Sequence, residues 1–399
     1  TGLRSPAGLS TNSSGDIFYS ENQGDWVGSG SITHAEKGDF MGNTAGLVWA
    51  GLPGSPVKLR TEDIPDTHEP KYEVAKRVPG LKTPSVWFPH TILGISTSGI
   101  LNYDAKGLMG PFEGQLFVGD QGQSKIMRVY LEKIKGVYQG VVFPFREGFS
   151  SGILRMNWGS DGSMFVGMTS RGWGSTGNMM FGLQQMVWNG KMPFEMQKVE
   201  VQSDGFEVSF TQPVDIKTAR NPASWKFSTF TYQYHHNYGS PVINQAVRNI
   251  KAIEVSPDHL KVRLVLDSMK LGYIHEIRAE GIKSADSAIE LLHNYGYYTL
   301  NKLPDNDKLL ITEQNKVTIP VPMQQHVMAD MKMPSKAIAK NTSSQPKEWT
   351  TGPDRSFVIG TKPGLKYDIE TITVKAGTKI KITFKNNDDM LHNLVITKP

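Results

Sequence analysis

The sequence contains no cysteine, no long apolar run and no block of charges of one sign. Without cysteine, the 399 residues cannot form a disulfide framework, a thiolate zinc site or a cysteine nucleophile. No run of about 18 apolar residues is present, so no membrane-spanning segment is predicted. The 43 basic and 38 acidic residues are interspersed and leave a net charge of +5. This pattern disfavours nucleic-acid binding.

The composition instead favours strands. Forty glycines, 23 prolines and 10% aromatic residues accompany many short aromatic and β-branched runs between turn signals, which predicts an all-β chain. The length predicts roughly two to four domains. The chain begins at Thr1 without an initiator methionine or a signal peptide and stops at Pro399 directly after an apolar strand. We therefore expect a fragment that is cut at both ends.

Three segments repeat one pattern, in which a turn with glycine leads into an aromatic-containing strand and a polar exit. Their glycines, Gly15, Gly114 and Gly162, are separated by 99 and 48 residues, and 99 is about twice 48. Such a period, with one degenerate unit between the first two segments, is typical of a β-propeller with four-stranded blades. An ordinary β-sandwich with recurring hairpins is the alternative. The segments are 15–22, 114–121 and 162–169.

Residues 1–200 are assigned to these blades and are expected to be the C-terminal part of a propeller. They hold at most about four blades of this size. An open arc of blades leaves unpaired edges on its terminal members. We therefore expect further blades before Thr1.

Residues 201–303 are predicted to form an immunoglobulin-like β-sandwich. Short runs of alternating apolar and polar residues recur there between turns, and a module of about 100 residues fits this fold. The runs that show the alternation are 206–210, 250–255, 260–266 and 273–277.

Residues 304–360 are predicted to be a linker or an extended segment, because they are rich in proline and polar residues and show little periodicity. Methionines in this segment are soft metal ligands, but methionine more often fills gaps in packing. Residues 361–399 predict three strands, at 367–374, 380–384 and 391–396, which form the first part of a sandwich that cannot stand alone. The methionines are Met323, Met328, Met331 and Met333.

The C-terminal residues resemble the start of plastocyanin, azurin and auracyanin-type cupredoxins. The resemblance implies that His392 is the first copper ligand and that Asn393 beside it braces the ligand loop; an imidazole suits copper. The remaining ligands, a cysteine, a second histidine and usually a methionine, are expected beyond Pro399. The alternative is a copper-free cupredoxin-like fold with a strand histidine at this position. The likeness rests on Val374-Lys-Ala-Gly-Thr378, Phe384-Lys-Asn-Asn-Asp388 and Met390-Leu-His-Asn-Leu-Val-Ile396.

Two further resemblances concern the rest of the chain. The middle stretch is similar to bacterial immunoglobulin-like modules found beside secreted enzymes, through residues 210–215, 219–225, 239–241 and 255–258. The first 200 residues resemble the six-bladed propellers of the sorbosone and glucose dehydrogenase kind. They resemble more closely the secreted bacterial proteins that join such a propeller to cytochrome c or cupredoxin modules. The architecture is implied and the activity is not. This likeness rests on residues 2–8, 21–26, 110–120, 137–145, 171–175 and 193–195.

Polar and aromatic residues follow the strands at matching positions of the repeats. Equivalent positions converge around a propeller axis, so we expect these residues to line one pocket. Arginine offers a rigid donor fork, tryptophan a stacking face, and amide and carboxylate groups hold hydroxyls or a cation. Such a lining would suit a carbohydrate-like molecule, pyrroloquinoline quinone or calcium. The residues are Asn22, Gln23, Asp25, Trp26, Asp120, Gln121, Arg171 and Trp173.

The same residues also have a structural interpretation: they would form turns and inter-blade hydrogen bonds, and Trp173 would pack between blades. His90 is the candidate base, because removing a proton from a sugar hydroxyl near neutral pH needs a pKa of about 6–7; a structural histidine is the alternative. His235 and His236 are adjacent on a predicted strand and so point to opposite faces. We do not expect them to chelate one metal ion.

The sequence therefore favours an extracytoplasmic redox protein that is periplasmic, secreted or bound at the cell surface. Its propeller would bind or oxidise a small carbohydrate-like substrate, as a quinone-dependent sugar or aldehyde dehydrogenase does. A type 1 copper domain would relay one electron to cytochrome c or another soluble carrier. The alternative is a non-catalytic scaffold that binds glycans or proteins, because a propeller fold does not decide its function.

Overall fold

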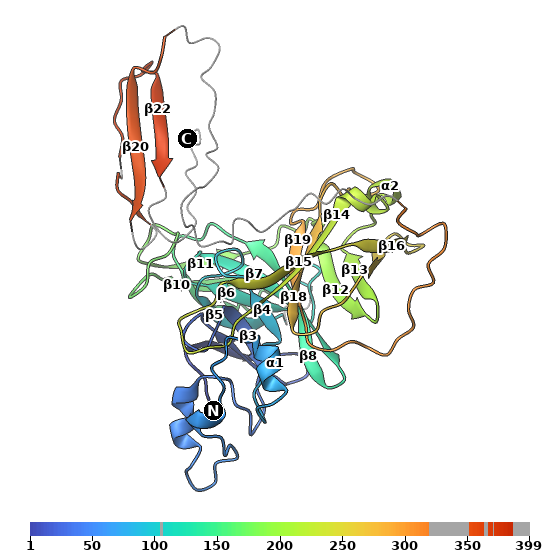
Figure 1. The fold of residues 1–399 in the computed structure, drawn as a ribbon. Coiled ribbons are helices and arrows are strands. Elements are labelled where there is room, and N and C mark those ends of the chain that lie inside the picture. Colours follow the sequence, from blue (N-terminus) through green and yellow to red (C-terminus); the bar gives the residue numbers. More distant parts are fainter. Residues whose placement is uncertain (104–106, 319–350, 363–365, 370, 386–399) are drawn as a thin grey trace.

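A computed structural model describes residues 1–103, 107–318, 351–362, 366–369 and 371–385. The chain is all-β, as the sequence predicted, with 43% of the described residues in strands and 6% in helices. Antiparallel meanders and a two-sheet sandwich make up most of it (Figure 1). In this part of the chain, no helix is long and apolar enough to cross a membrane.

Three propeller-like blades form the first part of the chain. Each is an antiparallel meander of sequential strands, and the first strands of the three meanders lie next to one another as inner strands. Blades 1 and 2 have four strands, whereas blade 3 has three in the described chain. Blade 1 contains β1 (Pro6–Thr11), β2 (Ile17–Glu21), β3 (Gly30–His34) and β4 (Val86–Phe88); blade 2 contains β5 (Thr97–Asn102), β6 (Leu116–Asp120), β7 (Lys125–Ile134) and β8 (Val137–Arg146); blade 3 contains β9 (Ile153–Trp158), β10 (Met164–Thr169) and β11 (Phe181–Met186).

The repeated phenylalanine explains how the blades pack. Phe18 and Phe117 occupy the same position in their repeats, and both are fully buried. Phe18 shares a core with Leu116 of blade 2, and Phe117 shares one with Val166 of blade 3. Neighbouring residues on a strand point to opposite faces, so each second strand contributes to two cores. Burying one such side chain stabilises the fold by about 1.5–3 kcal/mol.

Glycine in the inner strands lets the blades approach closely. A Cβ atom on Gly8 would clash with the carbonyl oxygen of Ser98, and one on Gly99 would lie 2.8 Å from the carbonyl oxygen of Leu154. A glycine followed by a branched aliphatic residue recurs in β1, in β5 and at the start of β9. This is a second repeat, which sequence reasoning missed.

A β-sandwich begins at Met196. One sheet has the order β12-β13-β17-β16 and the other contains β15-β14-β18-β19. Side chains from both sheets, including Phe206 and Trp225, form one buried core. The elements are β12 (Met196–Gln202), β13 (Gly205–Phe210), α2 (Ile216–Ala219), η3 (Pro222–Ser224), β14 (Trp225–Tyr232), β15 (Val242–Arg248), β16 (Ile250–Val255), β17 (Lys261–Leu266), β18 (Tyr273–Ala279) and β19 (Tyr295–Leu300).

Blade 2 and the sandwich share one continuous sheet. β19 pairs antiparallel with β8, the last strand of blade 2, in a register that sets Tyr297 opposite Val142. Eight strands therefore belong to one sheet. Arg128 of β7 lies fully buried at the same junction and donates to the Gln115 side chain and to the Met196 carbonyl oxygen, both at 2.7 Å. Residues on either side of position 200 are thus joined by backbone hydrogen bonds.

The stretch between β3 and β4 differs from the expected degenerate blade. Residues 35–85 form an insertion with its own small core, which also takes in Trp26 and Tyr234. These residues lack the alternation that would let them extend a sheet, and Asn43 caps a helical turn by accepting from the amide of Ala45 at 2.9 Å. The prediction of a further blade here was therefore wrong. Its helices are η1 (Thr44–Trp49), η2 (Thr61–Asp63) and α1 (Lys71–Ala75).

The described C-terminal residues form a small sheet of order β21-β20-β22, in which β20 and β22 pair in parallel. β22 matches the strand expected at 380–384, whereas residues 371–374 pair with no strand in the described chain. The third expected strand, at 391–396, lies outside the described residues, as do Met323, Met328, Met331 and Met333. The strands are β20 (Arg355–Lys362), β21 (Lys366–Tyr367) and β22 (Ile380–Lys385).

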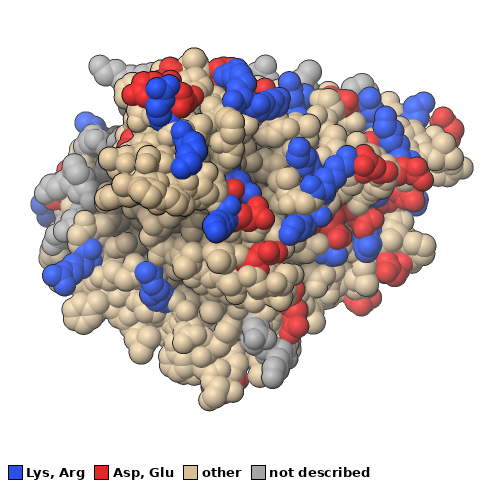
Figure 2. Space-filling model, turned by 90° about the horizontal axis from the view of Figure 1, so that it is seen from below, with Lys and Arg blue, Asp and Glu red and all other residues tan. Residues whose placement is uncertain are grey.

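Charges of both signs mix on the surface. Figure 2 shows acidic and basic side chains interspersed on one face, beside a wide area with few charged residues. Charged side chains of the described residues form ion pairs; Lys226, for example, lies 2.5 Å from Glu280. Surface pairs of this kind contribute about 0–1 kcal/mol each.

Candidate functional site

The residues that sequence analysis assigned to a propeller pocket lie at one end of the blades. In antiparallel meanders, the second strands all end on the same side, where the first strands begin. Glu21, Asp120 and Thr169 are the last residues of β2, β6 and β10. The predicted residues follow these strand ends, and His90 follows β4 at the same end. We call this end of the blades the strand-end face.

Consecutive blades touch each other across this face. The hydroxyl of Thr97, at the start of β5, donates to the carbonyl oxygen of Glu21 at 2.7 Å and to the Asn22 side chain at 3.3 Å. The amide of Thr176 donates to the carbonyl oxygen of Gly122 at 2.9 Å. The exit of each blade therefore lies beside a neighbouring blade.

Asp25 is held by two neighbours. Its carboxylate accepts from the Arg4 guanidinium at 2.9 Å and from the Asn43 amide at 2.9 Å. Burial acts to raise the pKa of Asp25, but these hydrogen bonds outweigh it and lower the pKa below its ordinary value. Asp25 is therefore an anion at neutral pH, and Arg4 neutralises it.

Trp26 and Gln23 are also engaged in local structure. The Trp26 ring is buried against Tyr234, with ring centroids 4.9 Å apart, and its backbone has a φ of 62°. The Gln23 amide donates to the carbonyl oxygen of Gly28 at 3.2 Å. These side chains shape the turn after β2 rather than present a free face.

Asp120 binds backbone amides of its own blade. One carboxylate oxygen accepts from the amides of Ile95 and Ser96 at 2.8 Å each, and the other accepts from Gln123 at 2.6 Å. Burial raises the pKa of Asp120, while these amide hydrogen bonds act against the increase. Both oxygens are occupied, so the group ties the start of β5 to the end of β6.

Glu21 performs the same task in blade 1, and sequence reasoning missed it. Its carboxylate accepts from the amides of Arg4 at 3.0 Å and Ser5 at 2.5 Å. The signal was present in the repeat, because Glu21 and Asp120 each follow the repeat glycine by six residues. Blade 3 has Met168 at that position. The repeated carboxylate is thus a structural feature of the four-stranded blades.

Arg171 and Trp173 are the exposed members of the strand-end face. The Arg171 amide donates to the Thr169 hydroxyl at 3.0 Å, while its guanidinium is exposed and has no partner within the described residues. Trp173 is 46% exposed. Their loop is anchored on blade 2, where the amide of Gly177 donates to the Ser124 hydroxyl at 3.0 Å. A donor fork and an aromatic face are therefore presented together on a supported loop.

Gln121 and Asn22 lie at equivalent positions of their blades. The amide of Gln121 donates to the carbonyl oxygen of Ser96 at 2.9 Å, and its side chain lies against Gly152 at the entry to blade 3. Asn22 lies against Thr97 at the entry to blade 2. Asn22 and Gln121 are only partly buried, so their side-chain amides lie near solvent.

His90 is mostly enclosed. Its Nδ1 atom is buried and has no hydrogen-bond partner within the described part of the chain. Burial lowers the pKa of His90 from 6.5 to about 4. The imidazole is therefore neutral at physiological pH, and its proton affinity is weaker than a base near neutral pH calls for.

The adjacent histidines follow β14 rather than lie on a strand, and they have different partners. His235 is buried and stacks on His68 with ring centroids 4.6 Å apart. His236 is exposed and lies 2.5 Å from the Asp66 carboxylate. Among the described residues, no group of three histidine or carboxylate side chains is placed to hold a metal ion. His392, the expected copper ligand, lies outside those residues.

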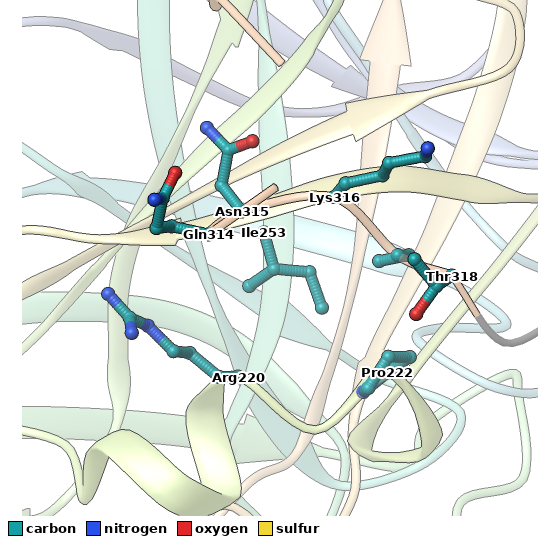
Figure 3. Close-up of a pocket in the computed structure, with 8 residues that line it drawn as sticks. Arg220, Pro222, Ile253, Gln314, Asn315, Lys316 and Thr318 are labelled. Carbon is teal, nitrogen blue, oxygen red and sulfur yellow. The ribbon is translucent and has the colours of Figure 1, made fainter. Parts of the chain in front are cut away.

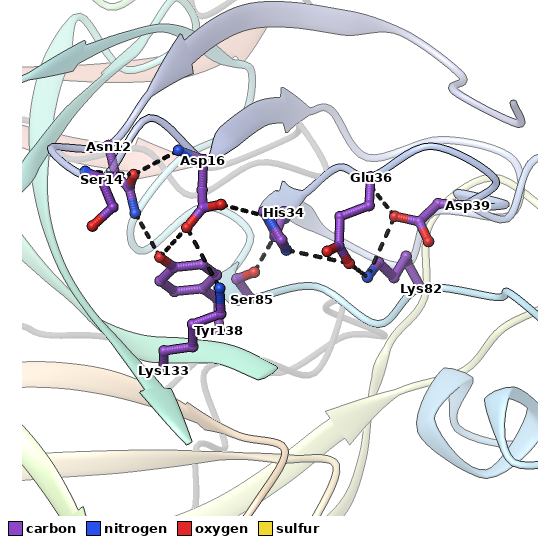
Figure 4. Close-up of polar contacts among 10 residues, drawn as sticks. All are labelled: Asn12, Ser14, Asp16, His34, Glu36, Asp39, Lys82, Ser85, Lys133 and Tyr138. Carbon is purple, nitrogen blue, oxygen red and sulfur yellow. Dashed lines mark hydrogen bonds and ion pairs between the residues drawn. The ribbon is translucent and has the colours of Figure 1, made fainter. Parts of the chain in front are cut away.

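The opposite ends of the blades hold a different polar cluster (Figure 4). Asp16 accepts from the Tyr138 hydroxyl at 2.5 Å and lies 3.6 Å from the ammonium of Lys133. His34 lies 3.8 Å from both Asp16 and Glu36, and burial lowers its pKa. These groups pair with one another and join blade 1 to the β7–β8 hairpin.

A small cavity lies on the sandwich and includes none of the strand-end residues (Figure 3). Its volume is about 170 Å³, below the roughly 300–1,000 Å³ of most ligand sites. Asn315 lines it but already donates to the Glu254 carboxylate and to the Leu310 carbonyl oxygen, each at 3.0 Å. We therefore do not assign it a ligand.

A wider hollow of about 580 Å³ lies between η1 and η2 of the insertion. Arg60, which lines it, is paired with Asp63 at 3.3 Å. Trp49, the last residue of η1, is exposed. The hollow has the size of a ligand site, but no aromatic residue is among those that line it.

Comparison with known proteins adds little. No protein-family model matches the chain, and no curated protein matches it. The PQQ-bound form of an aldose sugar dehydrogenase from Streptomyces coelicolor is similar over 47% of this chain and 44% of that one, with 18% identity and a TM-score of 0.29. Domains 1–6 of the surface layer protein SbsC are similar over 26% of this chain and 13% of that one, with 24% identity and a TM-score of 0.21. The chain spans less than half of either structure, and likeness at these TM-scores is too slight to assign a family.

Proposed function

We propose that the strand-end face binds a small carbohydrate-like molecule in an extracytoplasmic redox protein. The observation that carries this proposal is that one anchored loop exposes both a guanidinium, of Arg171, and an indole ring, of Trp173. Sugars are bound by stacking of their apolar ring faces on aromatic side chains and by hydrogen bonds to their hydroxyls. Asn22 and Gln121 add partly exposed amides on the same face.

Oxidation of the bound molecule is the finer part of the proposal, and His90 is its candidate base. The neutral imidazole with an unpartnered Nδ1 can accept a proton. Its pKa of about 4 makes it a weak base near neutral pH. Because burial lowers this pKa, turnover requires that substrate binding or a movement of the chain expose the ring. This burial favours binding over catalysis and keeps the glycan-binding scaffold as the second candidate.

Pyrroloquinoline quinone, if it were bound, would accept a hydride from the substrate. Its carboxylates need cationic partners, and on this face Arg171 is available while Arg4 is already paired with Asp25. Calcium would need clustered oxygen ligands, and the described residues contain no such group of carboxylates. The residues therefore fit these cofactors only in part, and we derive no step through them.

Copper electron transfer is proposed for the C-terminal module. His392 would contribute an imidazole nitrogen, whereas the thiolate of a type 1 site must come from outside these 399 residues, which lack cysteine. The natural redox partner would be cytochrome c or another soluble carrier. Loss of an intense visible absorption band of the copper-loaded full-length protein on His392→Ala tests this part.

Isothermal titration calorimetry of the purified protein with glucose and with a maltooligosaccharide tests the binding proposal. We expect Trp173→Ala and Arg171→Ala each to raise the Kd about fivefold, since each group contributes on the order of 1 kcal/mol. Trp49→Ala should leave the Kd unchanged; if it weakens binding instead, the site lies in the insertion. Dye reduction with added quinone and calcium separates enzyme from scaffold, and turnover that persists in His90→Gln removes His90 as the base.

A further inference from the structure

The loop that carries the adjacent histidines joins blade 1 to the insertion. Residues 235–240 lie between β14 and β15, and we call them the histidine loop. On the side of blade 1, the amide of Trp26 donates to the carbonyl oxygen of His235 at 3.0 Å, and the amide of Gly239 donates to that of Gly24 at 2.9 Å. The histidine loop therefore holds the turn that follows β2.

On its other side, the histidine loop is bound to the insertion by two contacts. The ring of His235 stacks on that of His68, with centroids 4.6 Å apart and planes inclined by 22°. The amide of His236 donates to the Asp66 carboxylate at 3.2 Å, and its ring Nδ1 lies 2.5 Å from the same group. The loop thus closes the gap between two parts of the chain that are distant in sequence.

His235 must be neutral in this arrangement. Its Nδ1 accepts from the amide of Asn237 at 3.0 Å, so that nitrogen carries no proton. A neutral imidazole has one acceptor nitrogen, whereas both nitrogens of the cation are donors. Protonation would set two donors against each other, place a charge on a side chain that is only 5% exposed, and bring it close to His68.

The charged groups around His235 do not compensate for this. Burial lowers the pKa of His235 below its ordinary 6.5, and His68 and His236 act in the same direction. Asp66 acts to raise it, but its carboxylate is bound to His236. The remaining groups have partners of their own: Arg4 pairs with Asp25, Glu69 pairs with Arg77, and Lys71 donates to the carbonyl oxygen of Met41.

We propose that the histidine loop is a pH-sensitive clamp, in which protonation of His235 opens the stack with His68 and releases residues 235–240 from blade 1. The closed loop binds fewer protons than the released loop, so release becomes favourable as the pH falls below about 6.5. Release would uncover Gln23, which lies against Gly239, and Asp25, which bridges to Tyr238. The clamp acts through backbone hydrogen bonds and therefore operates whether or not a sugar binds at the strand-end face.

Hydrogen–deuterium exchange at pH 7.5 and pH 5.5, corrected for the intrinsic pH dependence of exchange, tests the clamp. The opening equilibrium constant of the amides of Trp26 and Gly239 should rise about tenfold over this range, since the released His235 titrates near 6.5 while the closed one stays neutral. His235→Asn places an oxygen near the position of Nδ1 and cannot titrate, so its protection should be the same at both pH values. The peptides to follow cover residues 24–28 and 235–241.

His236→Asn is the matched control, because His236 is adjacent, titratable and exposed. This variant should keep the tenfold rise; if it loses the rise while His235→Asn retains it, the contact with Asp66 is the switch and the proposal is wrong. Unchanged protection in the natural chain also overturns it, as does an equal loss of protection in β13 and β17, which would indicate general unfolding. An NMR titration of the natural chain needs no variant: a pKa of His235 at or above 6.5 would refute the clamp.

Discussion

Replacing Glu132 by glutamine should stabilise the protein at pH 8 and change it little at pH 5. Glu132 lies on β7, and one carboxylate oxygen accepts from the Tyr298 hydroxyl at 2.5 Å and from the Val201 amide at 2.8 Å. Burial raises the pKa of Glu132 from 4.5 to about 7, although the Tyr298 hydrogen bond acts to lower it. An acid whose pKa is higher in the folded state makes the protein less stable as pH rises, because the unfolded chain releases the proton more readily.

The magnitude follows from this pKa difference. One pKa unit corresponds to about 1.4 kcal/mol, so a rise of the pKa from 4.5 to about 7 corresponds to ~3 kcal/mol. The side chain is only partly covered, so we discount this to about 2 kcal/mol for solvent screening. The stability contributed by the proton is full below pH 4.5, declines between pH 5 and pH 7, and is lost above about pH 8. Glutamine keeps the acceptor and cannot ionise.

Urea unfolding of the natural chain and of Glu132→Gln at both pH values measures the effect. Glu207→Gln is the control, because Glu207 pairs with Lys261 at 2.7 Å and its replacement should bring no gain at pH 8. The burial argument is refuted if Glu132→Gln matches the natural chain at pH 8. A stabilisation of the same size at pH 5 would refute it equally, since it could not come from ionisation.

Two further substitutions test the blade contacts by urea unfolding. Asp120→Asn should lower the free energy of unfolding by about 2 kcal/mol, because an amide NH₂ then faces the backbone donors of Ile95 and Ser96 or of Gln123; an unchanged midpoint would contradict this role. Gly99→Ala should lower it by about 1–3 kcal/mol through contact with the neighbouring inner strand, whereas an alanine in place of the glycine at position 51, which faces open space, should have little effect. Equal effects of the two alanines would show that inter-blade crowding is not the cause.

Local patterns predicted much of the fold. The repeat of Gly15, Gly114 and Gly162 located β2, β6 and β10, since a turn glycine and an alternating strand are specified by neighbouring residues. The same repeat misplaced a blade between Gly15 and Gly114, where the insertion lies. Spacing alone cannot distinguish a divergent strand unit from a segment that makes its own core.

For the candidate residues, the sequence predicted a shared end of the blades but not their partners. Residues at equivalent strand ends do lie at one end of the blades, because antiparallel order alone brings them there. Whether a side chain is free depends on partners far along the chain. Asp120 is occupied by amides about 25 residues away, Asp25 by Arg4 and Asn43, while Arg171 stays exposed.

The sequence by itself determined that the chain is all-β, where its repeated strands run, and which end of the blades carries the polar exits, because these follow from alternation and turn residues within a few positions. Only the tertiary structure decided that β8 pairs with β19, that Glu21 and Asp120 bind backbone amides, and that Phe165 is exposed where Phe117 is buried. Those outcomes depend on which distant surface meets each residue. Packing and desolvation assign that partner, and no local pattern encodes it.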